Sequence, residues 1–152
     1  MPKIQEIETC TLGENDVLLF RELVMLFNEV FEEYNTIASD KHLEDLLKRS
    51  NFKAIVAFQG DVLLGGLTTY ELPRYYNEKS ELYIYDFAVK TSFQGKGIGK
   101  MLIRHLEQHA KESNVELVFV EAHSEDLEAV KFYESTFGEG EKVDHFNYQI
   151  KL

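Results

Sequence analysis

The sequence predicts a single α/β domain over residues 1–152, built on a mixed, mostly antiparallel sheet with helices on both faces. A chain of 152 residues is long enough for one domain with a substantial core. Apolar side chains follow the helical period in some segments and alternate or run together in others. A glycine-rich turn joins a strand-like run to a helix-like run in mid-chain. The order of these segments predicts about seven strands and about four helices.

The N-terminal part begins with a strand followed by two helices. Residues 4–9 alternate between apolar and polar side chains, as a half-buried strand does. Residues 16–31 carry apolar side chains at helical spacing. Asp40 is the expected N-cap of a second helix, which runs through Ser50. We therefore expect two helices to lie between the first and second strands.

A hairpin follows these helices. Residues 52–58 and 62–72 are predicted strands joined by a Gln-Gly-Asp turn. Gly65 and Gly66 interrupt the second of them and predict a bulge or a close approach of another backbone. The remaining predicted elements are a strand at 81–89, a helix at 97–113, a strand at 117–122, a helix at 125–137 and terminal strands within 141–152.

Composition excludes several classes of protein. No apolar run is long enough to span a membrane, and the N-terminus lacks a signal-peptide core. Cys10 is the only cysteine, so no internal disulfide forms, which is typical of a cytoplasmic protein. The formal net charge is −11, from 16 basic and 27 acidic residues. This charge disfavours nucleic acid as a partner and favours a cationic one.

The glycine-rich turn at residues 92–100 predicts an anion site. Glycines let a ligand approach the backbone closely, and the first N–H groups of the following helix point at it. Lys96 and Lys100 add positive charge. The Walker phosphate loop is excluded because Gln94 and Met101 stand where it needs glycine and a hydroxyl, and the dinucleotide pattern G-x-G-x-x-G also fails. The pattern that remains is Gln-x-x-Gly-x-Gly.

This pattern resembles the pyrophosphate loop of the GCN5-related N-acetyltransferases, or GNAT family. The run Asp-Phe-Ala-Val at 86–89 precedes the loop as the fourth strand does in that family, and residues 126–138 resemble its Asn-x-x-Ala-x-x-x-Tyr helix. The resemblance implies the GNAT fold, with the fourth and fifth strands splayed apart, and acetyl-CoA as cofactor without a metal. The implied cofactor-binding residues are Phe87, Ala88, Val89, Gln94, Gly95, Lys96, Gly97, Ile98, Gly99, Lys100, Asp126 and Tyr133.

The catalytic residues follow partly from the resemblance. Tyr133 matches the general acid of the family, which hydrogen-bonds the leaving thiolate. Four residues are candidates for the base that removes the amine proton, namely Glu81, Asp86, Glu121 and His123. Strand alternation places Asp86 on the face opposite Glu81, Tyr83, Tyr85 and Phe87 unless a bulge intervenes. No nucleophile is positioned for a covalent intermediate, so we expect direct attack in a ternary complex.

The strand at residues 80–89 also resembles the small aminoglycoside 3-N-acetyltransferases, which modify gentamicin. The similarity runs from residue 52 to 146, but His123 stands where an acid is expected and Glu121 where an amide is usual. The resemblance implies acetylation of the 3-amino group of a 2-deoxystreptamine ring, a role in antibiotic resistance, and, by analogy, a homodimer. The expected substrate-binding residues are Glu32, Glu33, Tyr34, Tyr83, Tyr85 and Asp144.

Two other functions fit the sequence. One is a related acetyltransferase for another amine, such as a polyamine or a protein N-terminus. The other is a non-catalytic module that binds acyl-CoA. A metal site is not expected, because His105 and His109 lie one helical turn apart but no third ligand accompanies them.

Overall fold

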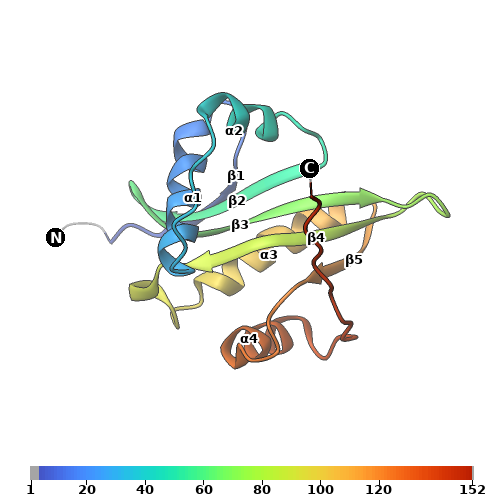
Figure 1. The fold of residues 1–152 in the computed structure, drawn as a ribbon. Coiled ribbons are helices and arrows are strands. Elements are labelled where there is room, and N and C mark those ends of the chain that lie inside the picture. The colour runs from blue at the N-terminus through green and yellow to red at the C-terminus, as the bar shows by residue number, and fades with distance from the viewer. Residues whose placement is uncertain (1–3, 152) are drawn as a thin grey trace. The chain divides into compact units, whose positions relative to one another are not determined.

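A computed structural model describes residues 4–151 and divides the chain into two compact units. The first unit ends at Val120 and contains a five-stranded sheet with three helices (Figure 1). Its elements are β1 Ile7–Thr11, α1 Val17–Val30, α2 Asp40–Leu47, β2 Phe52–Gln59, β3 Val62–Pro73, β4 Ser80–Val89, a 3-10 turn Thr91–Phe93, α3 Ile98–Glu112 and β5 Val115–Val120. The second unit begins at Glu121 and contains α4 Leu127–Phe137.

The sheet of the first unit has the strand order β1-β2-β3-β4-β5. The first four strands pair antiparallel, whereas β4 and β5 pair parallel. A parallel pair needs a long crossover, and α3 supplies it between β4 and β5. The sheet is therefore mixed and mostly antiparallel, as the sequence predicts.

Apolar side chains are buried on both faces of the sheet. Ala54 and Val56 of β2 pack with Phe20 and Leu23 of α1 in one cluster. Ile55 lies between them in sequence, points to the other face and is also fully buried. The buried residues of α3, which are Ile98, Leu102, Ile103 and Leu106, belong to the same fully buried core. Helices thus cover both faces, and a central strand such as β2 is apolar along most of its length.

The four predicted helices and the first five predicted strands are confirmed, with shifted ends. The first strand lies at Ile7–Thr11 rather than 4–9, and the fifth at Val115–Val120 rather than 117–122. The second helix is capped by Ser39, not Asp40, because the Ser39 side chain accepts a hydrogen bond from the His42 backbone N–H at 3.2 Å. It ends at Leu47, three residues before the predicted end.

The predicted sixth and seventh strands are wrong. Residues 139–151 form no strand, and residue 152 lies outside the described part of the chain. Phe146, Tyr148 and Ile150 alternate with polar residues, as the side chains of a half-buried strand do. All three side chains are exposed, and no backbone ladder includes them. Alternation describes one face of a strand but does not show that a partner strand exists.

The paired glycines of β3 confirm the predicted close approach. A Cβ added at Gly65 would lie 2.7 Å from the Ala88 carbonyl oxygen, and one at Gly66 would lie 2.7 Å from the Ile55 carbonyl oxygen. Glycine is therefore required at Gly65, against the end of β4, and at Gly66, against β2. None of the helices among residues 4–151 is long and apolar enough to cross a membrane.

Candidate active site

The glycine-rich loop joins β4 to the N-terminus of α3. Gly95 and Gly97 have φ angles of +76° and +82°, which only glycine adopts readily. Gly97 is the N-cap of α3, and its own backbone carbonyl accepts the Met101 N–H at 3.1 Å. A Cβ added at Gly95 or Gly97 would meet no atom within 4 Å. The space above the loop is therefore open to a ligand, and the first N–H groups of a fifteen-residue helix face it.

One side chain of the loop bonds the protein backbone, and two basic side chains face solvent. Gln94 donates a hydrogen bond from Nε2 to the Val89 carbonyl oxygen at 3.0 Å, so it ties the loop to the end of β4. The Lys96 Nζ lies 5.0 Å from the centre of the Phe93 ring. Lys96 and Lys100 are both exposed. Open glycines, a helix N-terminus and two exposed lysines fit the pyrophosphate of a CoA ester.

The strands β4 and β5 separate next to this loop. Their parallel register runs from Ser80 opposite Val115 to Ile84 opposite Val120. β4 continues to Val89, while β5 ends at Val120. The pairing of β4 with β5 therefore ends at Ile84 and Val120, and the last five residues of β4 have no partner in β5. Phe87, Ala88 and Val89, the predicted cofactor-binding segment, lie beyond the point of separation.

A β-bulge in β4 turns Asp86 toward the face of the sheet that carries Tyr83. Thr69 pairs with Ile84 and Thr68 pairs with Asp86, so Tyr85 is the extra residue. Cross-strand partners share a face, and Thr68 shares its face with Tyr70, the partner of Tyr83. Asp86 therefore lies on the same face as Tyr83. The alternation without a bulge gives the opposite placement and is wrong for Asp86.

The Asp86 carboxyl group lies in surroundings that raise its pKa. Its side chain is half-buried, and its backbone N–H donates a hydrogen bond to Thr68 Oγ1 at 3.3 Å. Burial raises the pKa of Asp86, and the nearby Glu33 carboxylate raises that pKa further. A carboxylate with a raised pKa holds a proton more strongly than an ordinary one, which suits a base. The charge of Glu33, in the α1–α2 connection, therefore acts on Asp86 of β4.

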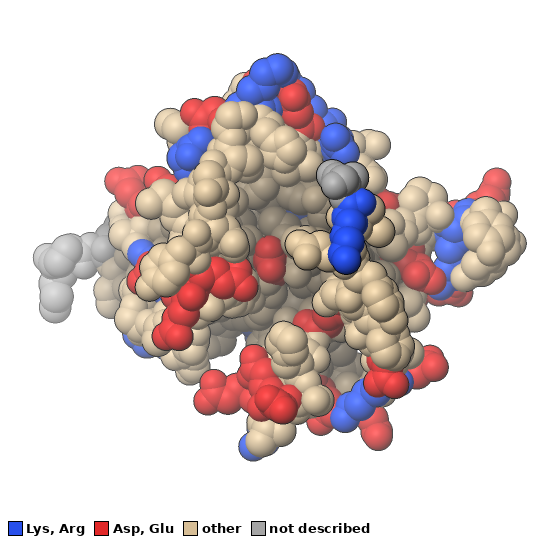
Figure 2. Space-filling model, in the orientation of Figure 1, with Lys and Arg blue, Asp and Glu red and all other residues tan. Residues whose placement is uncertain are grey.

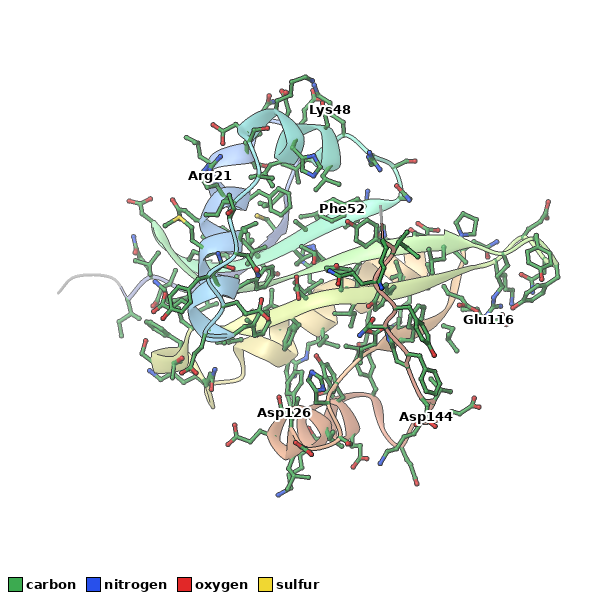
Figure 3. All side chains as sticks on the ribbon, viewed as in Figure 1. Arg21, Lys48, Phe52, Glu116, Asp126 and Asp144 are labelled. Carbon is green, nitrogen blue, oxygen red and sulfur yellow. The ribbon has the colours of Figure 1, made fainter. Side chains whose placement is uncertain are left out.

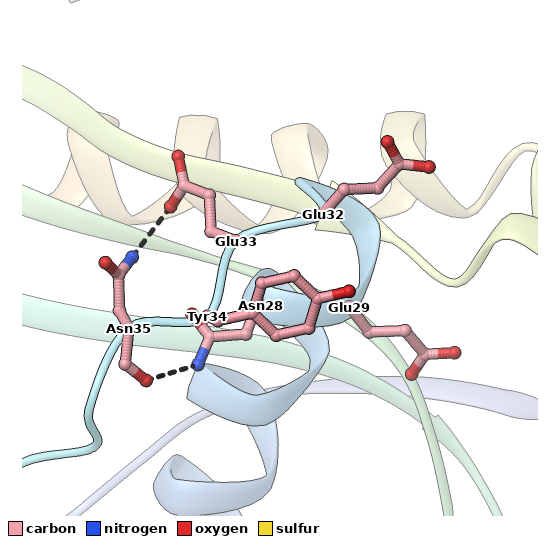
Figure 4. A pocket seen from close by; sticks show the side chains of 6 residues that line it. All are labelled: Asn28, Glu29, Glu32, Glu33, Tyr34 and Asn35. Atoms are coloured by element: carbon pink, nitrogen blue, oxygen red, sulfur yellow. Dashed lines mark hydrogen bonds between the residues drawn. The ribbon is translucent and has the colours of Figure 1, made fainter.

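A hollow of about 560 Å³ lies at the C-terminal end of α1 (Figure 4). The Glu33 side chain accepts a hydrogen bond from Asn35 Nδ2 at 2.8 Å, and Asn28 Nδ2 donates to the Asn35 carbonyl oxygen at 3.0 Å. The lining of the hollow carries carboxylates and amides, and none of the lining side chains is basic. The lining residues are Asn28, Glu29, Glu32, Glu33, Tyr34 and Asn35. The predicted substrate residues Glu32, Glu33 and Tyr34 are therefore brought together.

Comparison with known proteins agrees with this geometry. Residues 20–138 match the acetyltransferase (GNAT) family model. The chain belongs to this family. Its members use acetyl-CoA. No curated protein sequence matches the chain.

Solved structures similar to this acetyltransferase include aminoglycoside acetyltransferases. One, from an uncultured soil metagenomic sample and in complex with sisomicin, is 43% identical with a TM-score of 0.91, covering 95% of this chain and 97% of that one. The same protein in complex with trehalose gives 44% identity. Another aminoglycoside acetyltransferase from such a sample is 30% identical, with a TM-score of 0.91, covering 96% of this chain and 99% of that one.

Glu81 lies at the opposite end of β4 and is held in an ion-pair network. Arg74 Nε donates to Glu81 Oε1 at 3.1 Å, and a second Arg74 nitrogen bonds Glu116 of β5 (Figure 3). Lys79 Nζ also bonds Glu116, at 3.1 Å. The hydrogen bonds from Lys79 and Arg74 hold the pKa of Glu116 below its ordinary value. The network joins the β3–β4 hairpin to β5, which is a structural role for Glu81.

The second unit carries the remaining predicted residues of this acetyltransferase. Asp126 is the N-cap of α4 (Figure 3), and its side chain accepts the Ala129 N–H at 3.1 Å. Glu121 forms an ion pair with His145. Tyr133 is half-buried on α4, with its ring centre 5.5 Å from that of Phe132. His123 and Asp144 are exposed. Asp126 thus has a capping role that fits aspartate as well as asparagine.

The sequence analysis missed the aromatic residues that flank Asp86. Tyr70 of β3 contacts Tyr85, with ring centres 5.6 Å apart. Phe119 of β5 stacks on Tyr83 at 4.8 Å. The period-2 pattern places Tyr70 on one face of its strand, but it does not give the register that sets Tyr70 opposite Tyr83.

Proposed function

We propose that this acetyltransferase transfers the acetyl group of acetyl-CoA to the 3-amino group of 2-deoxystreptamine aminoglycosides. The observation that carries the proposal is the likeness at 43% identity, over 95% of the chain, to an aminoglycoside acetyltransferase in complex with sisomicin. The acidic hollow at the end of α1 supports it, because aminoglycosides are polycations. Acidic side chains are also spread over the face seen in Figure 2, and the formal net charge is −11.

The cofactor is held by the loop in this proposal. The N–H groups at the start of α3 bind the pyrophosphate, with Lys96 and Lys100 supplying counter-charge. The backbone of Phe87, Ala88 and Val89 binds the pantetheine arm beyond the strand separation. Acetyl-CoA supplies an activated acetyl thioester. Gln94 acts indirectly, through its hydrogen bond to the Val89 carbonyl oxygen.

Among the four candidate bases, Asp86 is the one that we propose removes the amine proton, directly or through a water. Its pKa is raised by burial and by Glu33, while Glu81 is committed to Arg74 and Glu121 to His145. A backbone N–H of β4 stabilises the charge that develops on the thioester oxygen. Tyr133 serves as the acid that hydrogen-bonds the leaving sulfur, a role that rests on the family resemblance. The amine attacks directly, in a ternary complex.

The test is the release of CoA thiol from acetyl-CoA by the purified protein with gentamicin, sisomicin, kanamycin or spermidine. Turnover with the deoxystreptamine drugs alone supports the proposal. Turnover with spermidine alone contradicts it and indicates an acetyltransferase for another amine. Tight CoA binding without turnover on any amine contradicts it and indicates a non-catalytic acyl-CoA module.

A further inference from the structure

Four aromatic residues form a row across four strands on one face of the sheet. Phe52 of β2 is the register partner of Tyr70 of β3, Tyr70 is the partner of Tyr83 of β4, and Tyr83 is the partner of Phe119 of β5. The ring centres of Phe52 and Tyr70 lie 5.1 Å apart in an edge-to-face contact. Those of Tyr83 and Phe119 lie 4.8 Å apart in a stack. We call these four residues the aromatic row.

Tyr85 is the bulge residue and rests on this row. Its ring makes edge contacts with Tyr70 at 5.6 Å and with Tyr83 at 5.7 Å. The Phe52 side chain at the start of the row is 3% exposed, whereas Tyr85 is 58% exposed. The row therefore connects the buried core to an exposed ring that is held on two sides. Two edge-to-face contacts restrain the position of this ring.

The surroundings of Tyr85 carry negative charge. Asp86 follows it in the chain and lies on the same face as the row. Burial is the main cause that raises the pKa of Tyr70. The neighbouring Tyr85 and Asp86 raise this pKa further, whereas the Arg49 guanidinium lowers it. Glu33 lies near enough to Asp86 to raise the pKa of that carboxyl group. Asp86 thus stands beside the exposed ring, and Glu33 adds negative charge to this part of the site, so that both carboxylates attract a cation.

We propose that Tyr85 is the aromatic platform on which the ammonium-bearing ring of the amine substrate rests, and that Tyr70 is a positioning residue that fixes the Tyr85 ring. The inference rests on the proposed function and adds residue roles to it. The face of a tyrosine ring attracts an ammonium group, and the effect grows when water is excluded. The aromatic row makes this face a fixed part of the site. Selectivity for cationic rings over neutral ones follows from the ring and the adjacent carboxylates together.

The test compares steady-state kinetics with sisomicin and acetyl-CoA for matched variants. For Tyr85→Leu we expect the KM for sisomicin to rise about tenfold, while the KM for acetyl-CoA stays parental. Tyr85→Phe keeps the ring and stays within about twofold of the parent. Tyr75→Leu is the control, because Tyr75 is 99% exposed in the β3–β4 connection and has no part in the row. A parental KM for sisomicin in Tyr85→Leu overturns the proposal.

The role of Tyr70 is tested in the same way. Because Tyr70 packs against the core, Tyr70→Leu is compared with Tyr70→Phe, which keeps the ring and the packing. We expect the KM for sisomicin to rise in Tyr70→Leu and to stay parental in Tyr70→Phe. An elevated KM in Tyr70→Phe overturns the positioning role. If the parent acetylates no aminoglycoside, the proposed function fails. Calorimetric binding of spermidine then decides the platform separately, since equal affinity of the parent and Tyr85→Leu overturns it.

Discussion

The rings of Tyr83 and Phe119 stack with centres 4.8 Å apart and an interplanar angle of 6°. The two residues are register partners in β4 and β5, one position before the last pair, Ile84 and Val120. Beyond that pair β5 ends and β4 continues to Val89. The stack therefore stabilises the parallel pair near the point where it stops. In the proposed function it also helps to define the opening for the cofactor arm.

Removing this stack should weaken both the fold and the cofactor site. For Phe119→Ala we expect the free energy of unfolding to fall by about 2 kcal/mol, less than for a fully buried phenylalanine, and the KM for acetyl-CoA to rise severalfold. Phe119→Tyr preserves the stack and should restore both values. Urea denaturation and thiol-release kinetics measure them. An unchanged KM in a destabilised Phe119→Ala protein would show that the stack has no part in shaping the opening.

The loop assignment predicts that Gly97→Val abolishes binding of acetyl-CoA. A side chain at φ +82° costs about 1–2 kcal/mol of strain, and the valine occupies the open space where the pyrophosphate lies. Gly138→Val is the control for strain, because Gly138 also has a positive φ, of +86°, but lies outside the loop. Calorimetry with CoA measures the affinity of each. Parental affinity in Gly97→Val, or equal loss in Gly138→Val, would contradict the assignment.

The raised pKa of Asp86 makes both rate and stability depend on pH. The folded state holds the Asp86 proton more strongly than the unfolded state does. In the unfolded state the carboxyl group has a pKa of about 3.9. The resulting stability is present below that value and is lost as pH rises through the folded pKa. Asp86→Asn should therefore be as stable as the parent or more stable at neutral pH. Its kcat should fall by about 100-fold or more, because the base is removed.

A matched pair of variants separates this role from general effects. Glu81→Gln should lower the melting temperature, because it removes the ion pair with Arg74. Its kcat should stay within about twofold of the parental value. Glu33→Gln removes the like charge beside Asp86, so the acidic limb of the kcat profile should move to lower pH. Profiles of kcat against pH give both results. A loss of kcat in Glu81→Gln as large as that in Asp86→Asn would refute the assignment of the base.

Two adjacent threonines of β3 should respond oppositely to the same change. Thr69 is 0% exposed and its hydroxyl has no hydrogen-bond partner among the described residues, whereas Thr68 Oγ1 accepts the Asp86 N–H. Thr69→Val should be neutral or stabilise by about 1 kcal/mol, because it removes an unsatisfied polar group. Thr68→Val should destabilise by about 1 kcal/mol. Urea denaturation measures both, and a destabilised Thr69→Val would mean that its hydroxyl is satisfied.

The sequence predicts most of the fold because its local signals agree with the long-range packing. The glycine-rich loop and the hairpin turn depend on residues near one another in the chain, and the adjacent Gly65 and Gly66 indicate a close approach although the contacting backbone is distant in sequence. The terminal strands do not, because Phe146 and Ile150 alternate correctly but find no partner in a ladder. The N-cap at Ser39 rather than Asp40 shows the usual ambiguity when two good capping residues are adjacent.

The site is predictable where a motif defines it and less so where register does. The loop residues follow from the spacing of Gly97 and Gly99. The placement of Asp86 depends on a β-bulge at Tyr85. The local sequence does not predict this bulge, because it is set by the pairing of β4 with β3. The proximity of Glu33 to Asp86 joins segments that are 53 positions apart, and only the tertiary structure shows it.

The central claim is tested most directly by the position of the acetyl group on the product. Sisomicin and acetyl-CoA are incubated with the purified protein, and the product is examined by two-dimensional NMR. We expect a single product acetylated at the 3-amino group of the 2-deoxystreptamine ring. Acetylation at another amine, or no acetylated sisomicin while spermidine is turned over, would contradict it.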